Sequence, residues 1–548
     1  MPRHPATILG LALVSSLAVP ACGVLGLDAD VLSIDAARRG FEVPARPVIV
    51  FYVDGLRKDV FETLASNGEM PRLRRHLLDR AASVRSAVAS VPSLTYTNAV
   101  SMLTGCWPSS HDVWSNVWFD RDQLLTRNYD DDCERADSDL VRPSMFELYE
   151  NDLTASVALP FKRASKISLA SSARSAGRLA WLSWAFNRKK DADRILAEQM
   201  YEIGEQARQI GEWPAFIAVH LPATDNTGHE EGCDTEKYRK AVANLEAGIG
   251  EVLETLANGG MLETLTIVLT SDHGHHPTPR SFQLDEFLNN ELQVPILHAE
   301  DNDGDDSYLD RFERYSPQRG VLITNGERVA SLHLRRGESW RERPGLEEIL
   351  AFPGGAGREG STLPDRLLNA SALGLIAVRD GVDAVRVHGR LGVAAIERER
   401  VADGDVAFRY RVLSGEDPLE YRRDARLASW IDEGAHPSRE WLAATAELDY
   451  PDAVPQLSMA FDHVRSGDVL LFAAPGWGFS DEYAGGHGAL AREEMLVPLY
   501  IAGPGIRSGA EVPAARLVDL VPTLIELVGL EIPPATRFDG VSFAPLLR

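Results

Sequence analysis

Positive charge is scarce in this chain, and so is cysteine. Lys and Arg together number 56 against 81 Asp and Glu, so the formal net charge is −25 over 548 residues. Nucleic-acid duplexes attract positive protein surfaces, and this balance therefore argues against duplex binding. After residue 22, no segment reaches about 18 uninterrupted apolar residues, the length that spans a bilayer. We expect no membrane-spanning segment in that part of the chain.

The first 22 residues are typical of an export signal. Arg3 and His4 precede an uncharged apolar run from Ile8 to Val19, which is short for a membrane span and ends in small residues. Val19-Pro-Ala-Cys22 also resembles a bacterial lipobox, in which the cysteine is acylated. We therefore expect an exported protein, in the periplasm, in the cell envelope or outside the cell, either lipid-anchored at Cys22 or released by ordinary cleavage. If Cys22 carries lipid, at most one disulfide forms among Cys106, Cys133 and Cys233.

The rest of the chain has the composition of a globular protein. Hydrophobic residues make up 44% and charged residues 25%, which is compatible with one large domain carrying insertions. Short, nearly continuous apolar runs, typical of strands buried on both faces of a parallel sheet, alternate with helical patterns. The predicted strands are 47–53, 216–221, 265–270 and 499–502, and the clearest helical patterns are 237–257 and 517–528. We predict an α/β fold, with a mostly parallel central sheet and helices on both faces.

This alternation stops between residues 291 and 455. The region carries an acidic stretch at 301–306, a Gly-rich stretch at 354–357 and short alternating segments, which indicate a smaller β-rich inserted subdomain. The catalytic core is then expected in two parts, 45–290 and 456–548. The acidic stretch lacks the spacing and final glutamate of an EF-hand loop, so a solvated loop is preferred over a calcium site.

Thr95 is the candidate nucleophile. Residues 91–105 place it at the predicted N-cap of a helix that stops at Gly105. A hydroxyl there faces free backbone N–H groups and the positive end of the helix dipole, where a phosphate binds well. Threonine alone is a poor nucleophile, but a divalent cation at its oxygen lowers the pKa of the hydroxyl. Most threonines that cap helices are structural, so the assignment depends on the surrounding residues.

Six further side chains are of types that bind metal ions. They are Asp54, Asp225, His229, Asp272, His273 and His487. Ligands in open α/β sheets bind beyond the carboxyl ends of strands, and the three aspartates all come just past such ends. Asp225 and His229 are spaced to converge on one ion, and His487 adds a ligand from a Gly-rich loop. Such a mixture of oxygen and nitrogen donors suits Zn²⁺, and also Mn²⁺ or Fe²⁺. We predict two metal sites beside the nucleophile.

These motifs resemble the alkaline phosphatase superfamily, and within it the type I phosphodiesterases or nucleotide pyrophosphatases. The resemblance covers roughly residues 45–290 and 455–548, including the segment 517–526 and Asp539-Gly540. It implies that one zinc is held by Asp54, Thr95, Asp272 and His273, and the other by Asp225, His229 and His487. It further implies that Asn98, three residues after the nucleophile, contacts a non-bridging phosphate oxygen.

The resemblance also implies a two-step displacement at phosphorus. Thr95 attacks first and water then releases the phosphothreonine intermediate, with two zinc ions about 4 Å apart stabilising the entering and leaving oxygens. The substrate is expected to be a small-molecule phosphate ester or a lipid headgroup. Diesters are preferred because Asn98 is neutral and no arginine follows Thr95 until Arg121. Loop 114–120, with Trp114, Trp118 and Phe119, is expected to offer the substrate a stacking surface.

Alternatives stay open at this point. Sulfatases of the superfamily carry C/S-x-P-x-R, which Thr95-Tyr-Thr-Asn-Ala does not match, so sulfate esters are not expected. Thr97 and Ala99 stand where nucleotide pyrophosphatases usually show Pro and His. Pro92-Ser-Leu-Thr95 with Asn98 resembles phosphonoacetate hydrolases at least as much as it resembles nucleotide pyrophosphatases. Cleavage of a C–P bond therefore stays open, and so does phosphoryl transfer to an alcohol. A catalytically silent binding protein on the same fold is the third hypothesis, and the intact set of ligands argues against it.

A basic stretch at Lys162–Lys190 is unusual in so acidic a chain. Eight Lys and Arg, together with Trp181 and Trp184, lie in a segment without any acidic residue. Such a segment can contact an anionic membrane surface or cover a phosphate-bearing substrate. A solvated helix whose aromatic residues pack on the domain is the simpler interpretation.

Overall fold

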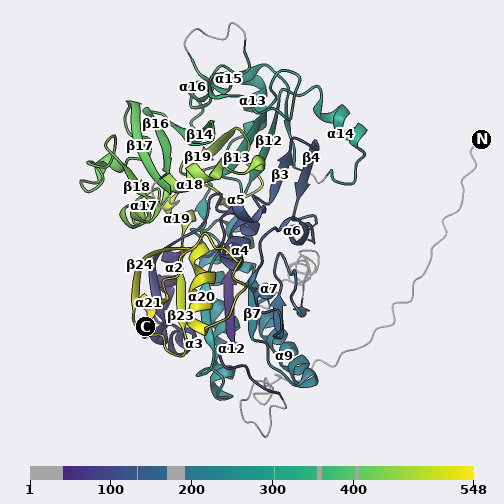
Figure 1. Ribbon diagram of the computed structural model, residues 1–548, viewed down its shortest axis with the longest axis vertical. Coiled ribbons are helices and arrows are strands. Elements are labelled where there is room, and N and C mark those ends of the chain that lie inside the picture. Colours follow the sequence, from purple (N-terminus) through teal and green to yellow (C-terminus); the bar gives the residue numbers. More distant parts are fainter. Residues whose placement is uncertain (1–40, 133, 170–191, 301–302, 355–360, 401–405) are drawn as a thin grey trace, which may run out of the picture.

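The computed structural model describes residues 41–132, 134–169, 192–300, 303–354, 361–400 and 406–548 (Figure 1). The predicted export signal, Cys22 and Cys133 lie outside these ranges, as does most of the basic stretch 162–190. In the ranges given, no helix is long and apolar enough to cross a membrane. Cys106 and Cys233 are both buried and form no disulfide there.

The first sheet lies in the lower half of Figure 1 and joins nine strands of the described chain. Their order is β22-β2-β23-β8-β1-β7-β5-β6, with β24 also paired to β2. The bounds are β1 Val48–Val53, β2 Ala82–Val88, β5 Thr154–Val157, β6 Ile167–Leu169, β7 Phe216–Leu221, β8 Thr266–Thr270, β22 Leu496–Val497, β23 Leu499–Ala502 and β24 Glu511–Arg516. β1 is central and pairs in parallel with both β7 and β8. The predicted mostly parallel sheet is confirmed, except that β23 runs antiparallel to β8 and β2, and β22 runs antiparallel to β2.

Alternate side chains of β1 build a hydrophobic core on each face of this sheet. Val48, Val50 and Tyr52 pack in one core with α4 (Thr95–Thr104) and α20 (Leu520–Val528). Ile49, Phe51 and Val53 pack in the other with α2 (Lys58–Ser66), α9 (Ala192–Ile210) and α12 (Leu245–Asn258). All six β1 side chains are fully buried, which explains the continuous apolar run. Helices therefore cover both faces, as predicted.

Three predicted helix boundaries need correction. The pattern at 237–257 forms two helices, α11 (Glu236–Ala243) and α12, which meet at Asn244. The pattern at 517–528 begins as a short 3₁₀ turn before α20. The N-cap of α4 is Leu94, so Thr95 is the first helical residue and not the cap. The predicted stop at Gly105 is confirmed, because this glycine has φ +70°, a left-handed conformation that few other residues adopt.

A second, mainly antiparallel sheet lies above the first in Figure 1. Its order is β11-β12-β13-β19-β14-β15-β16-β17-β18. The bounds are β11 Ile296–His298, β12 Gly320–Asn325, β13 Val329–Leu334, β14 Leu373–Asp380, β15 Ala384–Gly389, β16 Gly392–Arg400, β17 Val406–Gly415, β18 Ala435–Pro437 and β19 Val469–Ala473. The expected β-rich region is thus present. Its sheet does not end at residue 455, however, because β19 lies in its middle, between β13 and β14.

Candidate active site and metal centre

The ends of three neighbouring strands meet the start of a helix at one edge of the first sheet. Asp54 follows β1 and Asp272 follows β8, while Asp225 and His229 lie on α10 (Ala223–Glu231), the helix after β7. Thr95 opens α4. Because β7, β1 and β8 are parallel neighbours, their carboxyl ends carry these side chains to the same place. These five residues therefore converge beyond the carboxyl ends of the parallel strands, where the sequence predicted the site.

The first group of side chains surrounds the Thr95 hydroxyl. Thr95 Oγ1 lies 3.2 Å from His273 Nε2 and 3.5 Å from Asp54 Oδ1, and the last two atoms are 3.3 Å apart. Asp272 is fully buried, and its Oδ1 accepts hydrogen bonds from the backbone N–H groups of Gly55 and His273. Its Oδ2 has no hydrogen-bond partner and lies 3.7 Å from His273 Nε2. The structure thus brings together the four residues that the sequence assigned to one ion.

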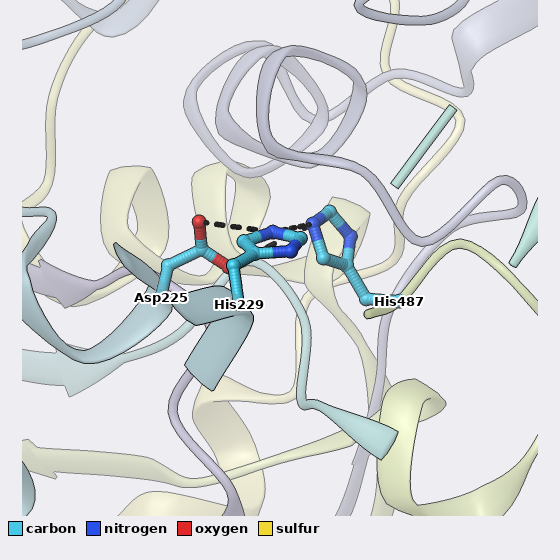
Figure 2. Close-up of side chains that lie close together, drawn as sticks. All are labelled: Asp225, His229 and His487. Atoms are coloured by element: carbon cyan, nitrogen blue, oxygen red, sulfur yellow. Dashed lines mark hydrogen bonds and ion pairs between the residues drawn. The ribbon is translucent and has the colours of Figure 1, made fainter. Parts of the chain in front are cut away.

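Asp225, His229 and His487 form the second group (Figure 2). The Nε2 atoms of His229 and His487 are 3.2 Å apart, and His229 Nε2 lies 3.4 Å from Asp225 Oδ2. The Nδ1 atoms contact carbonyl oxygens, His229 that of Gly485 at 3.1 Å and His487 that of Ser93 at 2.9 Å. Since a carbonyl only accepts, we infer that each ring donates from Nδ1, which leaves Nε2 as the atom that would bind a cation.

Asp225 belongs to both groups. Donor atoms of Asp225, His229 and His487 all lie within 4.8 Å of one another, and so do those of Asp54, Asp225 and His273. Asp225 Oδ1 and Asp272 Oδ2 are buried without a hydrogen-bond partner. A buried, unpaired carboxylate oxygen is costly unless a cation neutralises it. This arrangement of oxygen and imidazole donors fits two adjacent divalent cations.

The same crowding of acids shifts the titration of the first group. Burial and the charge of Asp54 raise the pKa of Asp272 to about 8. Burial by itself lowers the pKa of His273, but Asp272 and Asp54 outweigh it and raise that pKa to about 10. Asp272 and His273 therefore both hold protons near neutral pH when no cation is bound. Cation binding in their place must release those protons.

A pocket of about 450 Å³ opens onto Thr95, Asp54, Asp225, His229 and His487. Its wall also has the apolar residues Ala158, Leu159, Pro160 and Pro222, and two tyrosines, Tyr96 and Tyr483. Five of the described lining residues are acidic, namely Asp54, Asp130, Asp225, Glu230 and Glu327. No described lining residue is Lys or Arg. The described wall would therefore meet a phosphate without the charge of a Lys or Arg side chain.

Comparison with known proteins agrees with this geometry. A model of the type I phosphodiesterase/nucleotide pyrophosphatase family matches residues 48–337, just over half of the chain. The chain belongs to this family. The matched span contains six of the seven predicted metal-site residues and leaves out His487. Phosphodiesterases and pyrophosphatases of this family are metal-dependent hydrolases.

Several members of the type I phosphodiesterase family are similar to this chain. An ectonucleotide pyrophosphatase/phosphodiesterase of Caenorhabditis elegans is 21% identical over 258 residues, which cover 44% of this chain and 27% of that protein. An uncharacterized pyrophosphatase/phosphodiesterase of Schizosaccharomyces pombe is 25% identical over 256 residues, covering 46% of this chain and 49% of that protein. The chain thus spans between about a quarter and a half of the length of these curated relatives.

A solved member of the family shows the same fold. The structure of murine ectonucleotide pyrophosphatase/phosphodiesterase 5 superposes with a TM-score of 0.51 at 14% identity, and the match covers 89% of this chain and 96% of that one. The likeness extends well beyond residue 337, where the match to the family model ends. Both sheets of this chain therefore belong to the fold of the type I phosphodiesterase family.

The role predicted for Asn98 is not supported by its surroundings. Asn98 is fully buried, its Oδ1 accepts from Ser90 N–H at 2.6 Å, and its Nδ2 donates to the carbonyls of Ser90, Pro92 and Leu94. Its amide is committed to the turn that precedes α4, and the side chain does not line the pocket. Asn116 does line the pocket, and its Oδ1 accepts from Tyr96 N–H at 3.2 Å. With its Oδ1 held by that contact, Asn116 keeps its Nδ2 as a further donor at the pocket that Thr95 lines.

The aromatic stacking surface predicted around 114–120 is also absent from the pocket wall. Trp114, Trp118 and Phe119 are almost completely buried, and of this loop only Asn116 is among the described lining residues. Trp114 stacks on His463 and Trp118 lies under Arg465. These rings hold the loop against the protein, so Tyr483, which is 39% exposed, is the aromatic residue of the described wall that is open to a substrate.

Three residues near the metal centre were not identified from the sequence. His220 Nε2 lies 2.8 Å from Asp54 Oδ2, His275 Nε2 lies 3.2 Å from Asp225 Oδ1, and Glu327 Oε2 lies 2.9 Å from His229 Nδ1. A histidine within the apolar strand 216–221 was a usable signal for His220, as was the run Asp272-His-Gly-His for His275. Nothing in the sequence near Glu327 distinguishes it from other surface acids, because only the folding of β12 and β13 brings it to α10.

Proposed function

We propose that this protein hydrolyses phosphodiester or pyrophosphate bonds with two divalent cations, Zn²⁺ in the first place, through a phosphothreonine intermediate at Thr95. The observation that carries the proposal is the position of the Thr95 hydroxyl. It lies at the start of α4, against His273 and Asp54, beside two donor groups that share Asp225. Cations in these groups would supply the charge that lowers the hydroxyl pKa and neutralises the reacting phosphate.

The protein's own groups then have distinct tasks. Thr95 Oγ1 supplies the nucleophile, and the backbone N–H groups at the start of α4 favour the negative charge of the phosphate. Asn116 Nδ2, oriented by the Tyr96 N–H, is placed to donate to a non-bridging phosphate oxygen, the role first expected of Asn98. Tyr483, which contacts the His229 ring edge-on at 5.3 Å, offers a partly exposed aromatic surface to an ester group.

The charge of the pocket favours diesters. A monoester dianion carries one more negative charge than a diester, and a site specialised for it needs an additional cationic group. The described lining residues provide no Lys or Arg for this purpose. Arg121, the first arginine after Thr95, is buried and paired with Asp468 at 2.8 Å. Nucleotide-containing diesters and pyrophosphates are the first natural substrates to test, because the murine relative was solved in complex with AMP, the monoester that hydrolysis of such an adenosine compound releases.

A substrate comparison tests the proposal. We expect kcat/KM for bis(p-nitrophenyl) phosphate to exceed that for p-nitrophenyl phosphate by at least about tenfold, which corresponds to about 1.4 kcal/mol of transition-state stabilisation. Both esters release the same chromophore, so one absorbance assay with zinc-reconstituted protein measures both. A higher value for the monoester would contradict the diester preference. Turnover of phosphonoacetate alone would move the assignment to C–P cleavage.

We further propose that the chain is exported through residues 1–22, as their sequence pattern suggests. Peripheral membrane contact through an acylated Cys22 or through Lys162–Lys190 is a proposal with the same basis. Both can be tested by expressing the full chain in a bacterium with periplasm and separating the soluble and membrane fractions. Recovery in the cytoplasm with the first 22 residues still attached would contradict export. Membrane attachment that survives Cys22→Ser would assign the contact to the basic stretch.

A further inference from the structure

His275 is a buried imidazole that lies between the three segments carrying the metal-site residues. It is fully buried, two residues after His273. Its ring centre is 4.7 Å from that of His229 and 5.5 Å from that of His487. Its own backbone N–H donates to the Glu493 carbonyl at 3.1 Å, which fixes the chain at this position.

The chain leaves space for this ring by placing glycines against it. A Cβ on Gly228 of α10 would come within 2.7 Å of His275 Nε2, and one on Gly485 would come within 3.2 Å of Nδ1. Gly228 lies between Asp225 and His229 on their helix, and Gly485 lies two residues before His487. A larger residue at Gly228 would displace the imidazole, and one at Gly485 would first meet the Gly228 carbonyl oxygen at 2.4 Å. The ring is therefore enclosed by the same backbone that holds the second group of donors.

The hydrogen-bond geometry gives His275 a different proton position from its neighbours. His229 and His487 each contact a carbonyl through Nδ1, so a cation bound at their Nε2 atoms would leave those atoms no proton to donate to Asp225. His275 has no such carbonyl partner, and neither of its ring nitrogens has a well-aligned hydrogen bond. Its Nε2 lies 3.2 Å from Asp225 Oδ1, and among the described residues that oxygen is likewise without a hydrogen-bond partner. One buried donor and one buried acceptor thus lie close enough for a small rotation of either side chain to pair them.

We infer that His275 is a positioning residue of the metal centre, whose Nε2–H donates to Asp225 Oδ1 and orients the carboxylate shared by the two groups of donors. A residue that holds a metal ligand in this way raises metal affinity without touching the metal. The inference rests on the proposed two-cation centre. It predicts that the donor, and not the bulk of the ring, is what the centre requires.

Zinc affinity in three variants tests this inference. His275→Met removes the donor and keeps an unbranched, apolar side chain of similar reach, whereas His275→Gln keeps a terminal N–H. His276→Met is the matched control, because His276 is the next residue and its Nδ1 contacts only the Pro277 carbonyl. Affinity is measured by competition of the metal-free protein with a fluorescent zinc chelator, independently of hydrolysis. Melting of the metal-free proteins verifies that each variant is folded.

We expect His275→Met to weaken the binding of at least one zinc ion by about 10- to 100-fold. His275→Gln should recover most of that loss, and His276→Met should bind like the wild type. Unchanged affinity in His275→Met, or an equal loss in His275→Gln, would overturn the inference. If His275→Met does not fold, His275→Asn replaces it, since its shorter amide falls short of Asp225 and should also weaken binding. A wild-type protein that binds no zinc would instead remove the two-cation proposal itself.

Discussion

At the scale of single residues, two asparagines beside Thr95 have opposite surroundings. Asn98 is enclosed by the turn at Ser90–Leu94 and donates to three carbonyls. Asn116 faces the pocket, with its Oδ1 held by one backbone N–H. The same amide group therefore stabilises the fold at one position and is available to substrate at the other.

This contrast predicts separate effects of two alanine substitutions. Asn116→Ala should lower kcat/KM for bis(p-nitrophenyl) phosphate by about 10²-fold, the loss typical of one donor to a developing oxyanion, with unchanged stability. Asn98→Ala should lower the free energy of unfolding by about 1–3 kcal/mol, because it leaves buried backbone groups unpaired. Steady-state kinetics and urea denaturation of both variants measure the two effects. An Asn98→Ala protein of full stability whose activity alone is lost would return Asn98 to the site.

At the scale of elements, a neutral histidine connects α4 to α5 (Pro108–His111). His111 Nε2 lies 3.0 Å from Ser101 Oγ, and its Nδ1 accepts from Val113 N–H at 3.2 Å. Both ring nitrogens are thus used in the uncharged form. Burial, assisted by His463, lowers the pKa of His111 to about 3. The helix that carries Thr95 is therefore attached to its neighbour through a group that resists protonation.

This attachment predicts an acid-dependent loss of stability. In the unfolded chain the pKa of a histidine is about 6.5, so below that pH the unfolded state binds a proton that the native state does not. The contribution of His111 falls by up to about 1.4 kcal/mol per pH unit from about pH 6.5 down to its folded pKa, and is constant above pH 6.5. Urea denaturation in chelator at pH 7, 6 and 5 should show a shallower decline for His111→Gln than for the wild type. Identical declines would show that His111 does not contribute.

Strands and helices were predictable where burial decides the pattern, and less so where pairing decides it. β1, β7 and β8 are buried on both faces, which makes their apolar runs easy to recognise. The run at 499–502 is just as apolar, but its composition carries no information on direction, which is determined by pairing with β8 and β2. Likewise, residue type and strand ends singled out most of the candidate metal-binding residues that the structure brings together, whereas the commitment of Asn98 depends on the folded turn before α4.

At the scale of the whole molecule, the second sheet helps to build the metal centre on the first. The turn between β12 and β13 contributes Gly326, whose carbonyl accepts from His487 N–H at 2.6 Å, and Glu327, whose carboxylate lies beside His229 Nδ1. Gly326 has φ +53°, and a Cβ there would come within 2.7 Å of the His487 carbonyl oxygen. The region that the sequence marked as an insertion therefore supports two of the predicted metal ligands.

The two groups of donors predict the metal content of the protein. Zinc-reconstituted wild-type protein should contain close to two ions per chain, and chelator should remove the ions and the activity together. His487→Ala removes a donor of the second group only and should leave about one ion. Asp225→Ala should lose more, because Asp225 belongs to both groups. Elemental analysis of desalted protein measures this content, and a wild-type protein with at most one ion would contradict the two-cation centre.

The most direct test of the account is the turnover of bis(p-nitrophenyl) phosphate by Thr95→Ala at a metal content equal to that of the wild type. The substitution removes the nucleophile and leaves the carboxylate and imidazole donors in place, so turnover should fall by roughly 10³-fold or more. Thr95→Ser, which keeps a hydroxyl, should retain a measurable rate. A metal-loaded Thr95→Ala protein that keeps more than about a tenth of wild-type turnover would show that water, and not Thr95, attacks the phosphate.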